Sequence, residues 1–249
     1  MAAYKTLSAC LNWPTGLPPS DRTTTLVTGG LHADGSVLVP HFIASAIDQQ
    51  IPFVLVSFTQ TFSHYIHIMR KMGVNLASQQ NLQFVSALAA PVSQDLLSNL
   101  PPATRPHFVL DPDNWPAFFN WLNAQPPSLL IIDGLCSLLD QGMAADRALS
   151  FFKACQSSAA KLVVCMFADD ETSVPLAHAI VRRCHHVFSF DGLVSGASTD
   201  VSGQLTVVGG HLLCQLPNEQ RSFKPVVLHY KISDSSVHFF SPGQSRIVL

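Results

Sequence analysis

The sequence predicts an α/β protein with a doubly wound, mostly parallel central sheet, helices on both faces and antiparallel strands near the C-terminal end. Three observations support this fold class. Short apolar runs alternate with segments of helical periodicity as far as residue 190. The run 128–133 is continuously apolar and ends in an acid, as a strand buried on both faces does. After Asp191, short alternating runs separated by turn residues replace the helical segments, which is typical of antiparallel strands.

The first strands and helices alternate from residue 23 onward. The β-branched run 23–28 enters two glycines and predicts a strand, and apolar residues at helical spacing predict a helix over 36–49. Pro40 is compatible with that helix only in its first turn. The apolar run 53–58 predicts a second strand, and the helical segment 62–72 ends at a glycine.

The same alternation continues to residue 190 and then changes. Further strands are predicted at 82–87, 128–133, 161–167 and 186–190, and helices at 115–123, 146–157 and 174–183. Antiparallel strands are predicted at 204–208, 226–231 and 237–240. We expect a single domain over 1–249, with 1–22 as an N-terminal extension and 191–249 as antiparallel strands on the same sheet.

The composition is apolar for a protein without a membrane span. Hydrophobic residues make up 47% of the 249 residues and charged residues 12%, whereas about 25% charged residues is usual. We therefore expect some apolar surface to be buried against partners. The formal charge of −2 excludes a strongly basic nucleic-acid binder, but it allows RNA contact through a local patch or neighbouring subunits.

The compartment is predicted from the cysteines and from the lack of export signals. No apolar run approaches the roughly 20 residues of a transmembrane helix, and no secretory signal is visible at the start. No CxxC pair occurs among the cysteines, which are Cys10, Cys136, Cys155, Cys165, Cys184 and Cys214. We expect a cytoplasmic protein with reduced thiols, and a nuclear share stays open.

An altered phosphate loop follows the first predicted strand. A phosphate-binding loop needs glycines at fixed spacing, a lysine for the β and γ phosphates and a hydroxyl for Mg²⁺. Gly30 and Gly35 keep the spacing, but Ser36 occupies the lysine position and Val37 the hydroxyl position. Asp34 adds a charge that repels a triphosphate. We therefore expect no cofactor and no metal at this loop.

Asp133 ends the predicted central strand, where related nucleotide-binding enzymes place a carboxylate near Mg²⁺. This pattern is weak, because many central strands end in an acid. We favour the interpretation that Gly30 and Gly35 serve turn geometry and that Asp133 is an ordinary strand-end carboxylate.

Other clusters of polar residues favour structural roles. His64 and His67 lie three apart on a predicted helix but lack a third metal ligand nearby in the sequence. The acidic run 169–171 fits a solvated loop better than a metal site, and 192–196 has the wrong spacing for a serine nucleophile. His185 and His186 lie beside Arg182 and Arg183 at a predicted helix end. We expect this cluster to interact with the helix C-terminal dipole, and a phosphate contact is the alternative.

If the chain contacts RNA, the contact is expected from short basic clusters. Arg182 and Arg183 are the leading pair, and Arg70 and Lys71 come next. A role of the first pair at the helix C-terminal dipole, or in packing against a neighbour, is the alternative.

Four stretches in register resemble the Elongator complex protein 6 family: 60–65 continued by 70–76, 34–42, 191–196 with 200–201 and 203–205, and 230–232 with 237–240. The segment 91–124 does not align. The resemblance implies a RecA-like fold without a functional phosphate loop, and no catalytic residues.

The same resemblance implies partners and a role. The chain is expected to pair with the fourth and fifth Elongator subunits in a hetero-hexameric ring of two copies each. That ring docks on the catalytic subunits, binds tRNA and supports 5-carboxymethyl-type modification of the wobble uridine without performing it. The alternative is an active or nucleotide-sensing RecA-type ATPase with a degenerate phosphate loop.

Overall fold

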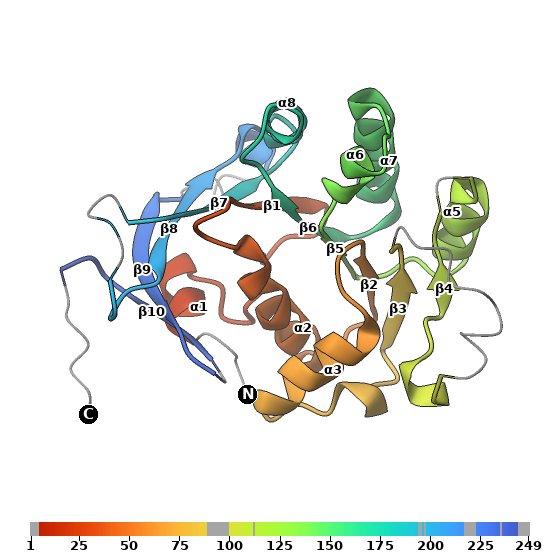
Figure 1. Cartoon of the computed structure of the whole chain (residues 1–249), viewed down its shortest axis with the longest axis horizontal. Helices are drawn as coiled ribbons and strands as arrows, with labels where there is room; N and C mark the ends of the chain where they lie inside the picture. Colours follow the sequence, from red (N-terminus) through yellow and green to blue (C-terminus); the bar gives the residue numbers. More distant parts are fainter. Residues whose placement is uncertain are drawn as a thin grey trace.

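A ten-stranded sheet runs through the computed structural model of the chain (Figure 1). The structure describes residues 5–88, 100–111, 113–193, 196, 198–216, 223–234 and 236–243. Its parallel strands are β1 Thr23–Gly29, β2 Phe53–Ser57, β3 Leu82–Ser86, β4 Phe108–Val109, β5 Leu129–Asp133, β6 Lys161–Phe167 and β7 His186–Asp191. Its antiparallel strands are β8 Gly203–Gly209, β9 Val226–Ile232 and β10 Val237–Phe240.

The strand order is β10-β9-β8-β7-β1-β6-β5-β2-β3-β4. The first strand of the chain, β1, therefore lies in the middle of the sheet, and the later strands lie on both sides of it. The C-terminal strands extend the same sheet beyond β7, and the predicted change from parallel to antiparallel pairing is confirmed. The predicted fold class is confirmed with it.

Helices cover both faces of the sheet (Figure 1). One face carries α1 Lys5–Leu11, α2 Val39–Asp48 and α3 Phe62–Lys71. The other carries α5 Trp115–Ala124, α6 Ser137–Asp140, α7 Ala145–Ser158 and α8 Ser173–Val181. Short 3-10 turns lie at η1 Gly35–Leu38, η2 Leu76–Ser78, η3 Pro102–Thr104 and η4 His211–Gln215. None of the helices described is long and apolar enough to cross a membrane.

The position of β5 inside the sheet explains why its sequence is continuously apolar. Leu129 and Ile131 belong to the core on the α2 and α3 side, whereas Leu130 and Ile132 belong to the core on the α5 and α7 side. A strand in the middle of a doubly wound sheet has no solvent face, so alternation is lost.

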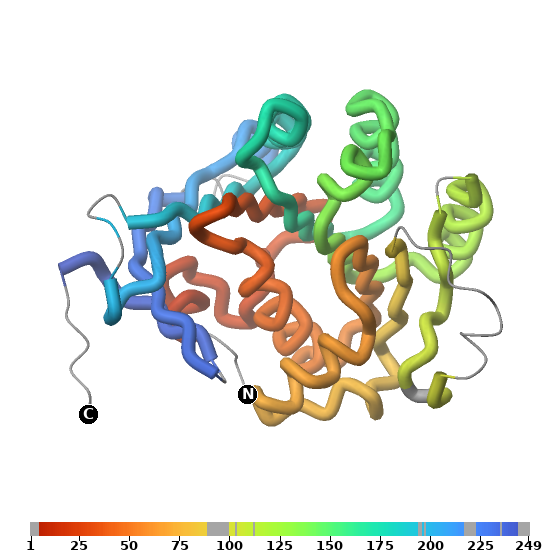
Figure 2. The backbone as a smooth tube through the Cα atoms, in the orientation of Figure 1, coloured from red at the N-terminus to blue at the C-terminus, as the bar shows by residue number. Residues whose placement is uncertain are grey.

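Side chains between residues 7 and 17 are part of the core. Leu7, Leu11, Trp13 and Leu17 are all buried. Figure 2 shows this red segment beside the blue C-terminal strands, and α1 contacts β10. The segment was predicted only as an extension, without a helix.

The helix predicted over 36–49 begins three residues later than expected. Residues Gly35–Leu38 form η1, and the α-helix starts at Val39 with Pro40 in its first turn. Proline has no backbone N–H and is tolerated only there. The short elements β4 and α6 were not predicted.

Candidate functional site

The loop after β1 folds tightly on itself. The backbone N–H of Gly30 donates to the Ala33 carbonyl at 2.9 Å, and the Ala33 N–H donates back at 3.1 Å. A Cβ at Gly29 would lie 2.4 Å from the Gly35 nitrogen, and one at Gly35 would lie 2.9 Å from Val27 Cγ1. The glycines at this turn therefore allow close backbone approach within the loop itself.

Two carboxylates of the protein accept backbone N–H groups of this loop. Asp34 Oδ1 accepts from the Ser36 N–H at 2.8 Å, and Asp34 Oδ2 accepts from the Ser36 hydroxyl at 2.6 Å. Asp169 Oδ2 accepts from the Leu31 N–H at 2.7 Å. In a phosphate-binding loop such N–H groups face the phosphates. Here the protein supplies its own anions to them.

Asp133 lies at the end of β5 and is buried, with 3% of its surface exposed. The Tyr65 hydroxyl donates to Asp133 Oδ2, and the Thr59 hydroxyl donates to the same oxygen at 3.2 Å. Tyr65 Oη also lies 3.0 Å from Ser57 Oγ, which accepts from the Gln60 N–H at 2.9 Å. The carboxylate is thus fixed by side chains that follow β2.

Burial raises the pKa of the Asp133 carboxyl above its usual value, while the hydrogen bonds from Tyr65 and Thr59 act in the opposite direction. Burial, followed by the charge of Asp133, raises the pKa of Tyr65 far above its usual range. Tyr65 therefore stays a neutral hydrogen-bond donor. The hydrogen bond between Tyr65 and the buried Asp133 therefore indicates a structural role for this carboxylate.

A cavity of about 670 Å³ lies beside the loop, at the carboxyl ends of β1, β5 and β6. Its wall includes α3 and the facing ends of β9 and β10. Among the lining residues described, three are carboxylates, Asp34, Asp133 and Asp234, against a single lysine, Lys71. Burial, with His67 nearby, lowers the pKa of His64, which also lines the cavity. The charge of this site does not favour a triphosphate.

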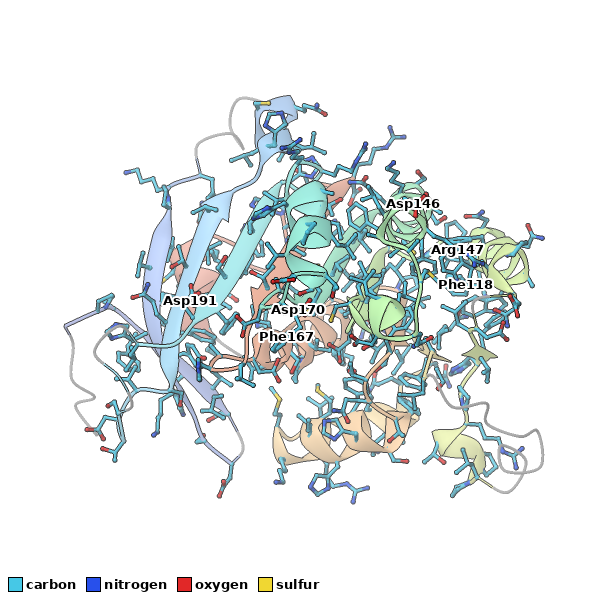
Figure 3. The ribbon with its side chains drawn as sticks, turned by 45° about the horizontal axis from the view of Figure 1, so that its top comes forward. Phe118, Asp146, Arg147, Phe167, Asp170 and Asp191 are labelled. Carbon is cyan, nitrogen blue, oxygen red and sulfur yellow. The ribbon has the colours of Figure 1, made fainter. Side chains whose placement is uncertain are left out.

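The acidic run 169–171 stabilises the start of α8. Asp170 Oδ1 accepts from the backbone N–H groups of Thr172 and Ser173, both at 2.8 Å. The hydrogen bond from the Thr172 hydroxyl, followed by those from Ser173 and from the Thr172 N–H, holds the pKa of Asp170 well below its usual value. Figure 3 labels Asp170 together with Phe167 and Asp191, which end β6 and β7. Asp170 therefore fixes the backbone where α8 begins, and Asp169 fixes the loop after β1.

The histidines do not form a metal site in the part of the chain that the structure describes. His64 and His67 are exposed on α3, and no group of three or more possible ligands occurs among the described residues. All six cysteines are free thiols.

His185 and His186 have structural roles that neither interpretation anticipated. His185 Nδ1 accepts from the Thr24 N–H at 3.0 Å, which requires an unprotonated ring nitrogen. His186 lies between Trp13, with ring centroids 4.9 Å apart, and Phe223, at 5.3 Å. Burial lowers the pKa of His185, and burial followed by the charge of His185 lowers that of His186 to about 4. Both interpretations, the helix dipole and the phosphate contact, are wrong for these two rings, because both rings are buried and His185 Nδ1 is used as an acceptor.

The two predicted basic pairs lie on different faces of the sheet. Arg182 and Arg183 are exposed at the end of α8, and Arg70 and Lys71 are exposed in the last turn of α3. Helix α8 packs on one face and α3 on the other. The pairs do not form one basic patch, and their contact with RNA stays a prediction. Within 192–196, residues 194 and 195 lie outside the described residues.

Two residues of the site were missed from the sequence. Tyr65 and Thr59 hold Asp133, and neither stood out, because they lie 68 and 74 residues from it. The available signal was a tyrosine on the apolar face of the helix that follows β2, next to a strand-end acid.

Comparison with known proteins identifies the family. The family model described as Elongation complex protein 6 matches residues 4–234 of this chain. The chain belongs to the Elongation complex protein 6 family. The expected family is thereby confirmed.

Curated members of the Elongation complex protein 6 family align along most of their length. Elongator complex protein 6 of Homo sapiens is 28% identical over 242 residues, which covers 87% of this chain and 89% of that protein. The Rattus norvegicus protein is 27% identical over 240 residues, with the same coverage of 87% and 89%. The Xenopus tropicalis protein is 29% identical over 240 residues, again covering 87% and 89%.

A solved structure supports the RecA-like fold. A KaiC-like protein from the hyperthermophilic archaeon Pyrococcus horikoshii superposes with a TM-score of 0.60 and 13% sequence identity. The match covers 88% of this chain and 90% of the archaeal one. At this identity the similarity concerns the fold alone.

Proposed function

We propose that this chain is a non-catalytic subunit of Elongator, assembled with the fourth and fifth subunits into a hetero-hexameric RecA-like ring of two copies each. The ring binds tRNA and supports 5-carboxymethyl-type modification of the wobble uridine, which the catalytic subunits perform. Two findings support this proposal: membership of the Elongation complex protein 6 family and a phosphate loop occupied by its own carboxylates.

The second finding carries the non-catalytic part. Phosphoryl transfer depends on cationic groups and a metal that stabilise the charge on the transferred phosphate. The loop has Ser36 and Val37 at the positions of the lysine and the metal-binding hydroxyl. Asp34 accepts the hydrogen bond of the Ser36 N–H, which a bound phosphate would need. These features weigh against the ATPase, and equally against a nucleotide sensor, because binding and catalysis use the same groups.

The ring itself is supported by composition. With 12% charged residues the chain has too few charges to cover a free surface. A subunit with neighbours on two sides buries such a surface. We place the ring in the cytoplasm, and tagged-protein imaging decides whether a share enters the nucleus.

Co-expression tests the proposal. The tagged chain is expressed with the fourth and fifth subunits, and the mass of the purified complex is measured by light scattering after gel filtration. We expect a hetero-hexamer that binds tRNA. A chain that stays a monomer in the presence of both subunits contradicts the proposal. ATP hydrolysis by the chain alone that is lost in Asp133→Ala supports the ATPase instead.

A further inference from the structure

Exposed apolar side chains gather around the mouth of the 670 Å³ cavity. Among the described residues, five large apolar side chains are exposed, and three of them border this cavity. Leu31 is 78% exposed, Ile232 43% and Phe167 37%. They come from the loop after β1, the end of β9 and the end of β6. Single exposed apolar residues are ordinary, but a cluster around a hollow marks an interaction site.

The cavity continues this apolar character inward. Its wall includes Val37, Pro40, Ile68, Met72 and Met166. Apolar side chains that enter such a hollow lose their contact with water, which stabilises a complex by about 25 cal/mol per Å² of apolar surface. Pockets that are filled by a few anchoring side chains contribute most of the binding energy at protein interfaces.

The charged groups at the cavity select a cationic partner. Asp34 and Asp234 are exposed at the cavity, and Asp169 lies against the same loop. Each Asp34 oxygen accepts one hydrogen bond within the loop, and a carboxylate oxygen can accept a second. A guanidinium or ammonium group is therefore attracted, whereas a phosphate is repelled.

We propose that this cavity receives a segment of a neighbouring protein subunit, in which an arginine or lysine lies between apolar side chains. The apolar side chains contact Leu31, Phe167 and Ile232, and the cation lies against Asp34 and Asp234. This inference rests on the proposed ring, because it assigns one of the ring's contacts to the altered phosphate loop. The arginine or lysine of the partner then lies at the altered phosphate loop, where the carboxylates would repel the phosphates of a nucleotide.

A matched pair of substitutions on β9 tests the apolar part. Ile232→Asp places a charge at the cavity mouth, and Val227→Asp places the same charge at a residue of nearly equal exposure, 42% against 43%, that does not line the cavity. Affinity of each folded variant for the fourth and fifth subunits is measured by biolayer interferometry. We expect a loss of at least tenfold for Ile232→Asp, and for Leu31→Asp, and less than twofold for Val227→Asp. Circular dichroism verifies that each variant is folded.

Asp34→Asn tests the charged part. Asparagine keeps an acceptor for the Ser36 N–H but removes the negative charge. We expect faster dissociation of the complex at low salt and a difference from the unmodified chain that shrinks at high salt, because salt screens charge pairs. An unchanged salt dependence overturns the cationic partner.

The outcomes separate this inference from the proposed function. If the unmodified chain forms no ring, both fail. If the ring forms and Ile232→Asp and Leu31→Asp bind as tightly as the unmodified chain, only the docking site is overturned. Equal losses in Ile232→Asp and Val227→Asp also overturn it, because the effect is then not specific to the cavity. Binding of ATP at this loop in the assembled complex, without release of the partner subunits, would show a nucleotide as the occupant and overturn it as well.

Discussion

The Tyr65 hydroxyl donates a hydrogen bond to the carboxylate of Asp133, and this hydrogen bond joins α3 to the end of β5. Both side chains are buried. A buried carboxylate is stable in a protein only when hydrogen bonds replace the lost water, so the pair contributes to holding the helix against the sheet.

Tyr65→Phe removes this donor and is expected to lower the free energy of unfolding by about 1–3 kcal/mol, because the buried acceptor loses a partner. The urea midpoint measures the loss. In Asp133→Asn the Tyr65 hydroxyl still has an acceptor, so a smaller loss is expected. If the two substitutions add independently in the double variant, the residues are not coupled and the expected role is wrong.

Restoring the standard loop residues tests the effect of Asp34 on nucleotide binding. Ser36→Lys with Val37→Thr is expected to leave ATP binding weak in calorimetry, because Asp34 still repels phosphate and remains beside the Ser36 N–H position of the loop. Adding Asp34→Gly is expected to strengthen ATP binding by about 10- to 100-fold, which corresponds to a charge-assisted hydrogen bond of about 1.5–3 kcal/mol. Equal ATP affinity in the double and triple variants contradicts this effect.

The buried histidine pair predicts loss of stability in mild acid. The folded-state pKa of His186 is about 4, below its unfolded value of 6.5. The unfolded chain therefore binds more protons between these two pH values, and stability falls as pH decreases from about 7 to about 4. His186 alone contributes a loss of up to about 3 kcal/mol.

Denaturation curves at several pH values measure this dependence. His186→Phe keeps a ring between Trp13 and Phe223 and is expected to flatten the pH dependence. Curves of the unmodified chain, measured under the same conditions, are the comparison. A slope that His186→Phe leaves intact assigns the acid sensitivity to other groups.

The basic pairs predict separable effects on tRNA affinity. If the proposed ring binds tRNA as we infer, Arg182→Ala with Arg183→Ala in that ring is expected to lower the slope of log affinity against log salt by about two for duplex contacts and by less for single strands. Glutamate substitutions are expected to weaken binding further because they add repulsion. The pair Arg70 and Lys71 lies on the other face, so its effect is expected to add independently. An unchanged slope, with the ring intact, points to the partner subunits as the RNA contact.

The order of strands and helices was predictable because most elements are decided by local patterns. Strands buried on both faces are continuously apolar, and the β-α alternation implies parallel pairing. Helix α1 was missed because its short sequence carries no capping signal, and its burial depends on distant strands. The two-residue strand β4 lies in a proline-rich stretch and is defined only by its pairing with β3.

For the site, the sequence alone predicted only that the phosphate loop lacks its lysine and its metal-binding hydroxyl. Ser36, Val37 and Asp34 indicated from the sequence that the phosphate loop is altered. That Asp34 binds back onto Ser36, and that Asp169 reaches Leu31 across 138 residues, depends on the folded loop. The histidine pair was misinterpreted because sequence distance hides its packing partners, Trp13 and Phe223.

The sheet ends in short strands on both sides, with two residues in β4 at one edge and four in β10 at the other. Long exposed edges recruit strands from other molecules and lead to fibrillar aggregation, whereas short ones offer little backbone to pair with. Among the described residues, a copy of the chain that is not assembled with other subunits therefore exposes apolar side chains but only short runs of unpaired strand backbone at the two edges of the sheet. We therefore expect an unassembled copy to form amorphous aggregates more readily than ordered fibrils.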